Sequence, residues 1–331
     1  MAGLGMANET SHVVETKSIG NVHVYVQGAV LPLKPVFLTV HDLGCNHYQY
    51  EDFVGNPNML PINHRSVWLH IDLPGQGDGD EELPASYSFP PISKLPEAIK
   101  EVLDHFKQGS YNDPRCSDTE SQRIRQVVLF GEGAGANILA RFAIMYDDLV
   151  LGAILIQCTG APATLAESIK DKLINWKLNM SGMNAATESF LILHRFGQIL
   201  DTESEVELRN AVENFRQNLR HSINPKNLNK FITSYMQRNN LSDSLAGLKC
   251  PVLFITGSLS PQRKACRHLY EDLVRAQRHT DHNTITLSNL KLQKSPLQLN
   301  RRMSMEDYDR PLGKMHFVSR FSHRLSEEAD T

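Results

Sequence analysis

Short runs of apolar residues recur along the chain, and each run stops at residues that favour turns. Most are rich in Val, Ile, Leu and Phe and do not alternate with polar residues, which is typical of strands buried on both faces of a parallel sheet. The runs cover 22–28, 35–40, 66–73, 126–130, 151–157, 250–256 and 283–287. The segment HVVETKS precedes the first run, and we expect the two to pair across a turn at Gly20-Asn21.

Helical patterns lie between these runs. Apolar residues share one helix face within 93–107 and within 135–148. The first stripe holds Leu95, Ile99, Val102, Leu103 and Phe106, and the second holds Ile138, Leu139, Phe142 and Met145. Strand and helix in alternation predict an α/β fold with a doubly wound, mostly parallel sheet.

Residues 163–242 interrupt that alternation. Four helical patterns follow one another there, with no convincing strand between them: 164–180, 185–200, 203–219 and 225–240. Because a strand returns at 250–256, we expect this block to be a helical cap inserted into a domain that spans 12–290. The chain becomes polar and mixed in charge over 291–331, where we expect a largely disordered C-terminal tail.

The strand at 126–130 runs into the turn Gly131-Glu132-Gly133-Ala134-Gly135 and then into a helix. In many hydrolases this turn reads G-x-S-x-G, and its central serine attacks the substrate. Here Gly133 stands at the centre and has no side chain. Such a tight turn needs small residues and a strained backbone that glycine tolerates. We therefore expect a degenerate nucleophile elbow, kept as architecture by Gly131, Gly133 and Gly135.

Other polar residues follow neighbouring strands, at the edge where α/β sheets bind ligands. The combined pattern resembles the α/β-hydrolase fold and, more narrowly, the N-myc downstream-regulated (NDRG) family, over residues 12 to 290. The residues that carry the resemblance are His41-Asp42-Leu43-Gly44 with Asn46 and Tyr48, Asp72 with Pro74-Gly75, Gly131, Gly133, Gly135 and Ala136 with the helix NILARFA, and the later CPVLFITG. The resemblance implies a non-enzymatic protein linked to stress response, differentiation and signalling.

The other two parts of a hydrolase triad are also missing from their usual places. The turn that would hold the acid carries Ser258 and Ser260 and no carboxylate. No histidine follows 283–287 until His316 and His323 in the polar tail. The family's closing helix is not evident there either. We interpret His41, Asp42, Asp72 and Glu132 as a vestigial pocket without a catalytic residue.

Several short motifs suggest a cofactor or a metal site, but each lacks a residue or spacing that such a site needs. The turn GEGAGA also fits a loose dinucleotide fingerprint, but the next strand ends in Gln157 and not in the acid that would bind a ribose. The pairs His41-Asp42 and His70-x-Asp72 lack further ligands at sensible spacing, and 76–82 lacks the spacing of a calcium loop. We expect neither a cofactor nor a metal.

Two displaced catalytic residues stay open as alternatives. Cys45 would be a substitute nucleophile, although an inert thiol is the simpler interpretation. Glu132 would be a general base, although a structural hydrogen-bonding role is the simpler one.

Composition and charge exclude several classes of protein. Of the 331 residues 41% are hydrophobic and 21% charged, and the formal net charge is −3, so no nucleic-acid partner is indicated. Five scattered cysteines indicate reduced thiols in the cytosol. We expect no signal peptide, no myristoylation and no transmembrane segment.

These observations predict a cytoplasmic signalling or adaptor protein that acts through unidentified protein partners. The alternatives are an esterase-like hydrolase with displaced catalytic residues and a small-molecule sensor that uses the vestigial pocket. Peripheral membrane contact is suggested by family likeness only. Arg301 and Arg302 precede Ser304, a pattern that suits a basophilic kinase, and the phosphorylated C-terminal regions of the family support Ser304 as a regulatory site.

Overall fold

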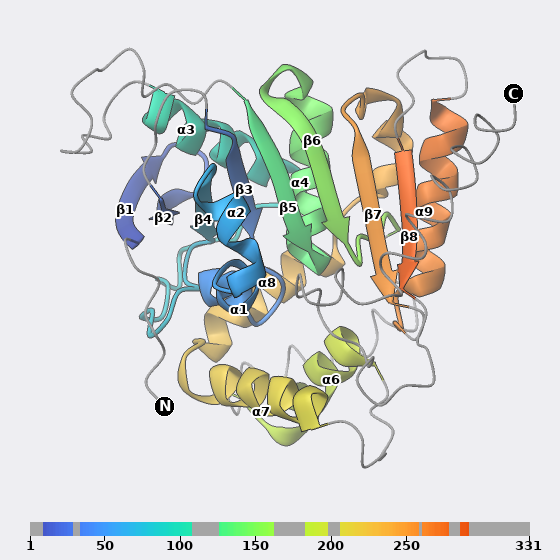
Figure 1. Ribbon diagram of the computed structural model, residues 1–331. Helices are drawn as coiled ribbons and strands as arrows, with labels where there is room; N and C mark the ends of the chain where they lie inside the picture. The colour runs from blue at the N-terminus through green and yellow to red at the C-terminus, as the bar shows by residue number, and fades with distance from the viewer. Residues whose placement is uncertain are drawn as a thin grey trace, which may run out of the picture.

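A computed structural model describes residues 9–28, 34–107, 126–161, 183–197, 206–257, 260–277 and 285–290. They form an eight-stranded sheet in the order β1-β2-β4-β3-β5-β6-β7-β8 (Figure 1). The strands are β1 (Glu9–Thr16), β2 (Gly20–Gln27), β3 (Val36–Val40), β4 (Val67–Asp72), β5 (Val127–Glu132), β6 (Val150–Ile156), β7 (Val252–Gly257) and β8 (Ile285–Leu290). All pairs from β4 to β8 are parallel, and only β1–β2 and β2–β4 are antiparallel. The predicted mostly parallel α/β sheet is confirmed.

The first hairpin turns earlier than the sequence predicts. Thr16 pairs with Gly20, so Lys17–Ile19 form the turn, and Gly20-Asn21 belong to β2. Gly20 has a φ of +84°, which suits the left-handed position that follows a three-residue hairpin loop. The Thr16 hydroxyl donates to the Gly20 carbonyl and accepts from the Ile19 N–H, which closes the turn.

Helices cover both faces of the sheet. The longer ones are α3 (Leu95–Lys107), α4 (Gly133–Met145) and α9 (Arg263–Ala276); short turns form η1 (His47–Tyr50), α1 (Glu51–Val54), η2 (Pro57–Met59), α2 (Leu60–Asn63), η3 (Ile92–Lys94), η4 (Asp147–Leu149) and η5 (Leu241–Gly247). Alternate residues of β4 serve different faces: Leu69 and Ile71 join the large core that includes α3 and α4, whereas Trp68 packs with Tyr50 and Phe130 in a smaller one.

The helices α6 (Ala185–Phe196), α7 (Val206–His221) and α8 (Pro225–Met236) follow β6 and precede β7. Figure 1 places α6 and α7 beyond the carboxyl ends of the central strands, as predicted for a cap. The first of the four predicted cap helices (164–180) and the tail (291–331) lie outside the described residues, so the domain boundaries stay predictions. None of the described helices combines the length and apolarity needed to cross a membrane.

Candidate functional site

The elbow between β5 and α4 depends on glycine. Gly133 has a φ of +58°, a conformation that residues with a side chain rarely adopt. A Cβ atom at Gly133 would overlap the Asp42 carboxylate, and one at Gly135 would overlap the Val40 carbonyl oxygen. At Gly131 a Cβ atom would lie 2.8 Å from the Leu139 side chain. The turn therefore has the compact geometry of a nucleophile elbow, with a neighbouring carboxylate where the nucleophile's side chain would be.

Asp42 comes from the loop after β3 and makes the central contact of the site. Its Oδ1 accepts a hydrogen bond of 2.8 Å from the Ala134 N–H. In serine hydrolases of this fold, the N–H of the residue after the nucleophile is one of the two donors that hold the substrate's oxyanion. The Asp42 carboxylate thus occupies the position of that oxyanion.

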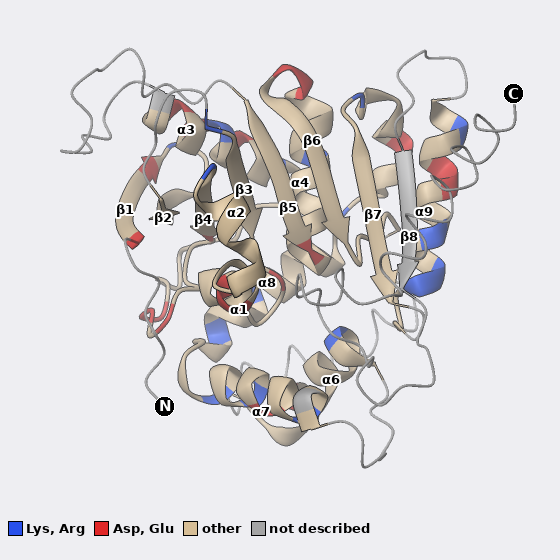
Figure 2. Cartoon of the chain, viewed as in Figure 1, with Lys and Arg blue, Asp and Glu red and all other residues tan. Residues whose placement is uncertain are grey.

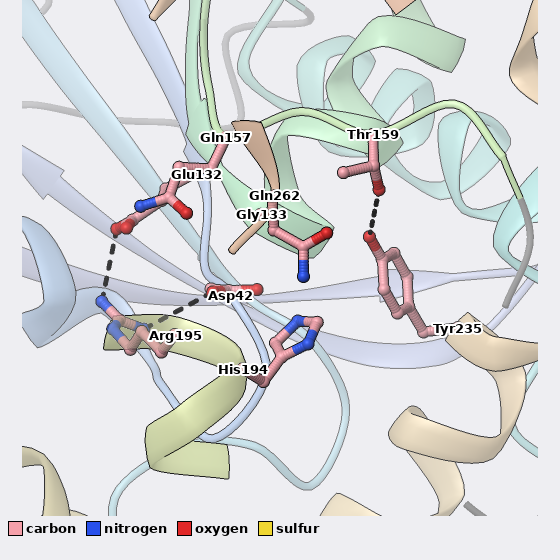
Figure 3. Close-up of a pocket in the computed structure, with 9 residues that line it drawn as sticks. All are labelled: Asp42, Glu132, Gly133, Gln157, Thr159, His194, Arg195, Tyr235 and Gln262. Atoms are coloured by element: carbon pink, nitrogen blue, oxygen red, sulfur yellow. Dashed lines mark hydrogen bonds and ion pairs between the residues drawn. The ribbon is translucent and has the colours of Figure 1, made fainter. Parts of the chain in front are cut away.

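Arg195 reaches this carboxylate from helix α6 of the cap. Its guanidinium lies 3.7 Å from Asp42 Oδ2 and 3.3 Å from Glu132 Oε2 (Figure 3). It also contacts Cys45 Sγ. The Arg195 side chain is only 2% exposed. Glu132 Oε2 accepts a second hydrogen bond, of 2.7 Å, from Gln49 Nε2. A buried cation therefore links the cap to two buried carboxylates at the sheet edge.

Little space remains beside this cluster. A cavity is lined by Asp42, Glu132, Gly133, Gln157, Thr159, His194, Arg195, Tyr235 and Gln262. Its volume of about 10 Å³ is enough for roughly one water molecule. Figure 3 shows His194 and Tyr235 on the cap side and the Gln262 amide near Asp42. Gln157 has a φ of +51°, the one positive φ among the described residues other than glycine.

The structure brings together two of the four residues that the sequence suggests for a vestigial pocket. Asp42 and Glu132 line the cavity, whereas His41 and Asp72 do not. His41 Nε2 accepts from the Leu73 N–H at 3.1 Å, so Nδ1 carries the proton and donates to the Asp42 carbonyl. Burial lowers the pKa of His41, which favours this neutral form. His41 therefore braces the loop that carries Asp42.

Asp72 serves a different histidine. Its two oxygens accept from the His47 backbone N–H and from His47 Nδ1, each at 2.6 Å. The suggested pocket role of Asp72 therefore has no support in these contacts.

Several residues that line the cavity were not predicted from the sequence. Of the four clearest cases, three come from the cap, and the fourth lies between β7 and α9. These are His194, Arg195, Tyr235 and Gln262. Arg195 had a detectable signal: it follows Leu191 and Ile192 at helical spacing, and both are buried. A charged residue on the apolar face of a helix requires a buried partner of opposite charge.

Cys45 is in a poor environment for a nucleophile. Burial raises the pKa of its thiol, and this effect outweighs the opposing influence of Arg195. The thiol therefore stays protonated near neutral pH. Within the described part of the chain, no three residues among His, Cys, Asp and Glu are grouped so that they would hold a metal ion.

The four described cysteines, Cys45, Cys158, Cys250 and Cys266, are all buried. In the folded protein at pH 8 we expect these thiols to react slowly with a thiol reagent such as DTNB. In urea we expect them to react as fast as the thiols of an unfolded peptide. Burial raises all four pKa values, so little thiolate is present. Peptide mass spectrometry would locate each modified residue. If Cys45 of the folded protein reacted as fast as Cys45 of the protein in urea, the interpretation of Cys45 as an inert thiol would be wrong.

The sequence matches the Ndr family over residues 11–112 and 116–305. It is 32% identical to the uncharacterized protein ZK1073.1 of Caenorhabditis elegans over 251 residues, which cover 74% of this chain and 69% of that protein. It is 31% identical to protein NDRG3 of Xenopus tropicalis over 260 residues, which cover 76% of this chain and 60% of NDRG3. The chain therefore spans less than two thirds of the length of NDRG3.

Solved structures support the same fold. A thermophilic esterase from Thermogutta terrifontis aligns with a TM-score of 0.65 and 16% identity, covering 95% of this chain and 99% of the esterase. MenH from S. aureus aligns with a TM-score of 0.62 and 15% identity, covering 92% and 98%. Likeness at this identity shows the α/β-hydrolase fold alone. The match of the family model over most of the sequence shows that the chain, which has this fold, belongs to the Ndr family.

Proposed function

We propose that this protein is a non-catalytic member of the α/β-hydrolase fold that acts through protein partners. The observation that carries the proposal is the hydrogen bond between Asp42 Oδ1 and the Ala134 N–H. An ester hydrolase stabilises the negative oxygen of its transition state with such an N–H. A fixed carboxylate there uses the donor and repels a second negative charge.

The contacts around Asp42 add to this proposal. Arg195 neutralises part of the carboxylate charge and ties the cap to the elbow. The arrangement is therefore stable in a closed state and does not require a substrate. The remaining 10 Å³ also argues against the small-molecule sensor, since a metabolite needs far more room.

The alternative hydrolase with displaced residues has less support. Cys45 lacks a low pKa, and Glu132 is engaged by Gln49 and Arg195 and so is poorly placed to take a proton from a nucleophile. The finer role, a cytoplasmic signalling or adaptor factor in stress response, growth or differentiation, is supported by the family resemblance. Ser304 lies outside the described residues, and its phosphorylation stays a prediction.

The test is activity-based labelling of the full chain with a fluorophosphonate, together with turnover of a panel of p-nitrophenyl esters. We expect no labelling and no turnover above the buffer rate, because the oxyanion donor is occupied. An active serine esterase of the same fold serves as the positive control. Turnover that disappears in Glu132→Ala or Cys45→Ala but persists in the surface variant Glu213→Ala would overturn the proposal.

A further inference from the structure

A second histidine–carboxylate pair lies outside the elbow cavity, at the carboxyl ends of β3 and β4. The His47 ring donates from Nδ1 to Asp72 Oδ2 at 2.6 Å, and its Nε2 is buried without a hydrogen-bond partner. Tyr25 stacks on one side of His47 with ring centroids 3.5 Å apart. Tyr48 packs against His47 at 4.0 Å and is 49% exposed. A ladder of three rings therefore connects the sheet to the surface.

Carboxylates surround this ladder. Burial raises the pKa of Tyr48, and the charges of Asp78, Glu9 and Glu51 raise it further, so these three groups lie close enough to act on its hydroxyl. None of the three forms an ion pair with a described residue. Figure 2 shows red on α1 and at the start of β1, on the same side of the molecule. Negative charge is therefore concentrated and uncompensated around an exposed aromatic ring.

Two polar atoms of this surface lack partners. Glu9 Oε2 and His47 Nε2 are both buried, and neither takes part in a hydrogen bond. Burial raises the pKa of Glu9, and His47 is the largest influence in the opposite direction, which places the two groups near each other. An arginine or lysine side chain would supply donors to the carboxylate and a cation over the Tyr48 ring.

We propose that this acidic aromatic face, formed by Glu9, Tyr25, His47, Tyr48, Glu51 and Asp78, binds Arg301 and Arg302 of the same chain, which residues 291–300 connect to β8. The whole segment 291–302 contains no Asp or Glu and ends in these two cations. Its charge is complementary to that of the face, so the contact satisfies groups that are otherwise unpaired.

The topology delivers the segment to the correct edge. β8 ends at Leu290 and is aligned with the parallel strands, so the chain leaves the sheet at the edge where His47 and Asp72 lie. Six strand intervals of about 4.8 Å separate β8 from β2, which is about 29 Å. Eleven extended residues span about 37 Å, so Arg301 reaches the face with slack. A phosphate on nearby Ser304 would add about −1.5 to −2 charges and weaken the contact.

The first test is zero-length crosslinking of the full chain with a carbodiimide. The carbodiimide adds to a carboxylate to give an O-acylisourea. A lysine amine then attacks the acyl carbon, so that an amide bond forms, the bond to the isourea oxygen breaks and the urea leaves. Because only positions near 301 reach the face, the chain used carries Arg301→Lys/Arg302→Lys, and we expect amides from these two positions to Glu9, Glu51 or Asp78 that persist on dilution and decrease with salt. Mixing chains labelled with ¹⁴N and ¹⁵N separates the cases: hybrid crosslinks mean that a second copy is the occupant, which overturns the intramolecular proposal.

The second test measures tryptic cleavage after Arg301 and Arg302 by mass spectrometry. In Glu51→Gln/Asp78→Asn we expect cleavage about threefold faster or more than in the unaltered chain, since two surface charge contacts are lost. The matched control Asp243→Asn/Glu271→Gln makes the same change in net charge far from the face and should leave the rate unchanged. Equal cleavage of all three proteins, with no crosslink to the face, would show that the segment is not docked there.

Discussion

Replacement of Arg195 by leucine is expected to lower the free energy of unfolding by about 3–5 kcal/mol, the usual cost of removing one partner from a buried charge cluster. Arg195 is the cation beside Asp42 and Glu132, and leucine would leave both carboxylates buried without it. It would also remove the guanidinium that lies 5.1 Å from the centre of the Phe215 ring. Urea unfolding at pH 7, followed by circular dichroism, measures the change.

The matched control is Arg220→Leu on helix α7. The Arg220 side chain is 47% exposed, and its partner Glu188 keeps Arg216 at 2.7 Å. We therefore expect a loss below about 1 kcal/mol. If Arg195→Leu were as mild as Arg220→Leu, the cluster would not hold the cap, and the closed state proposed for the site would lose its main support.

The strands were predictable because most of them are buried on both faces. Runs such as VWLHID in β4 have no exposed residue, so the apolar pattern is continuous and the strand is found within one residue at each end. Helix α9 is not among the helices that the sequence predicts. Its buried residues are Cys266, Leu269 and Leu273, and more than half of its other residues are charged or histidine. So narrow a stripe is a weak signal even though the helix packs on β7.

The site was predictable only where it follows strand ends. Gly133, Asp42 and Glu132 adjoin β3 and β5, and parallel strands bring their carboxyl ends to one edge. Arg195 lies in the cap; its place on the apolar face of a helix indicates a buried partner of opposite charge, but no local pattern says that the partner is the carboxylate pair at that edge. His41 and Asp72 follow the same rule, yet their side chains bind Leu73 and His47, because a strand-end position fixes the edge but not the direction of the side chain.

Gly133→Ser, which restores the hydrolase pattern at the elbow, is expected to destabilise the protein by about 2–5 kcal/mol. A residue with a side chain costs roughly 1–2 kcal/mol at a left-handed φ, and forcing atoms into a packed site adds about 1–3 kcal/mol. The new Cβ atom would meet the Asp42 carboxylate, which would have to leave the Ala134 N–H and move against Arg195. Chemical unfolding of purified variants measures the loss.

Gly79→Ser separates the two costs. Gly79 has a φ of +67°, and a Cβ atom there would meet nothing within 4 Å, so only the backbone cost of about 1–2 kcal/mol applies. The overlap at Gly133 is isolated by a double-mutant cycle with Asp42→Gly, which removes the obstructing carboxylate. We expect the serine to cost at least about 1 kcal/mol less in that background, a coupling typical of residues in contact. Additive effects would mean that the carboxylate moves aside freely and that Asp42 does not hold the oxyanion position against a nucleophile's side chain.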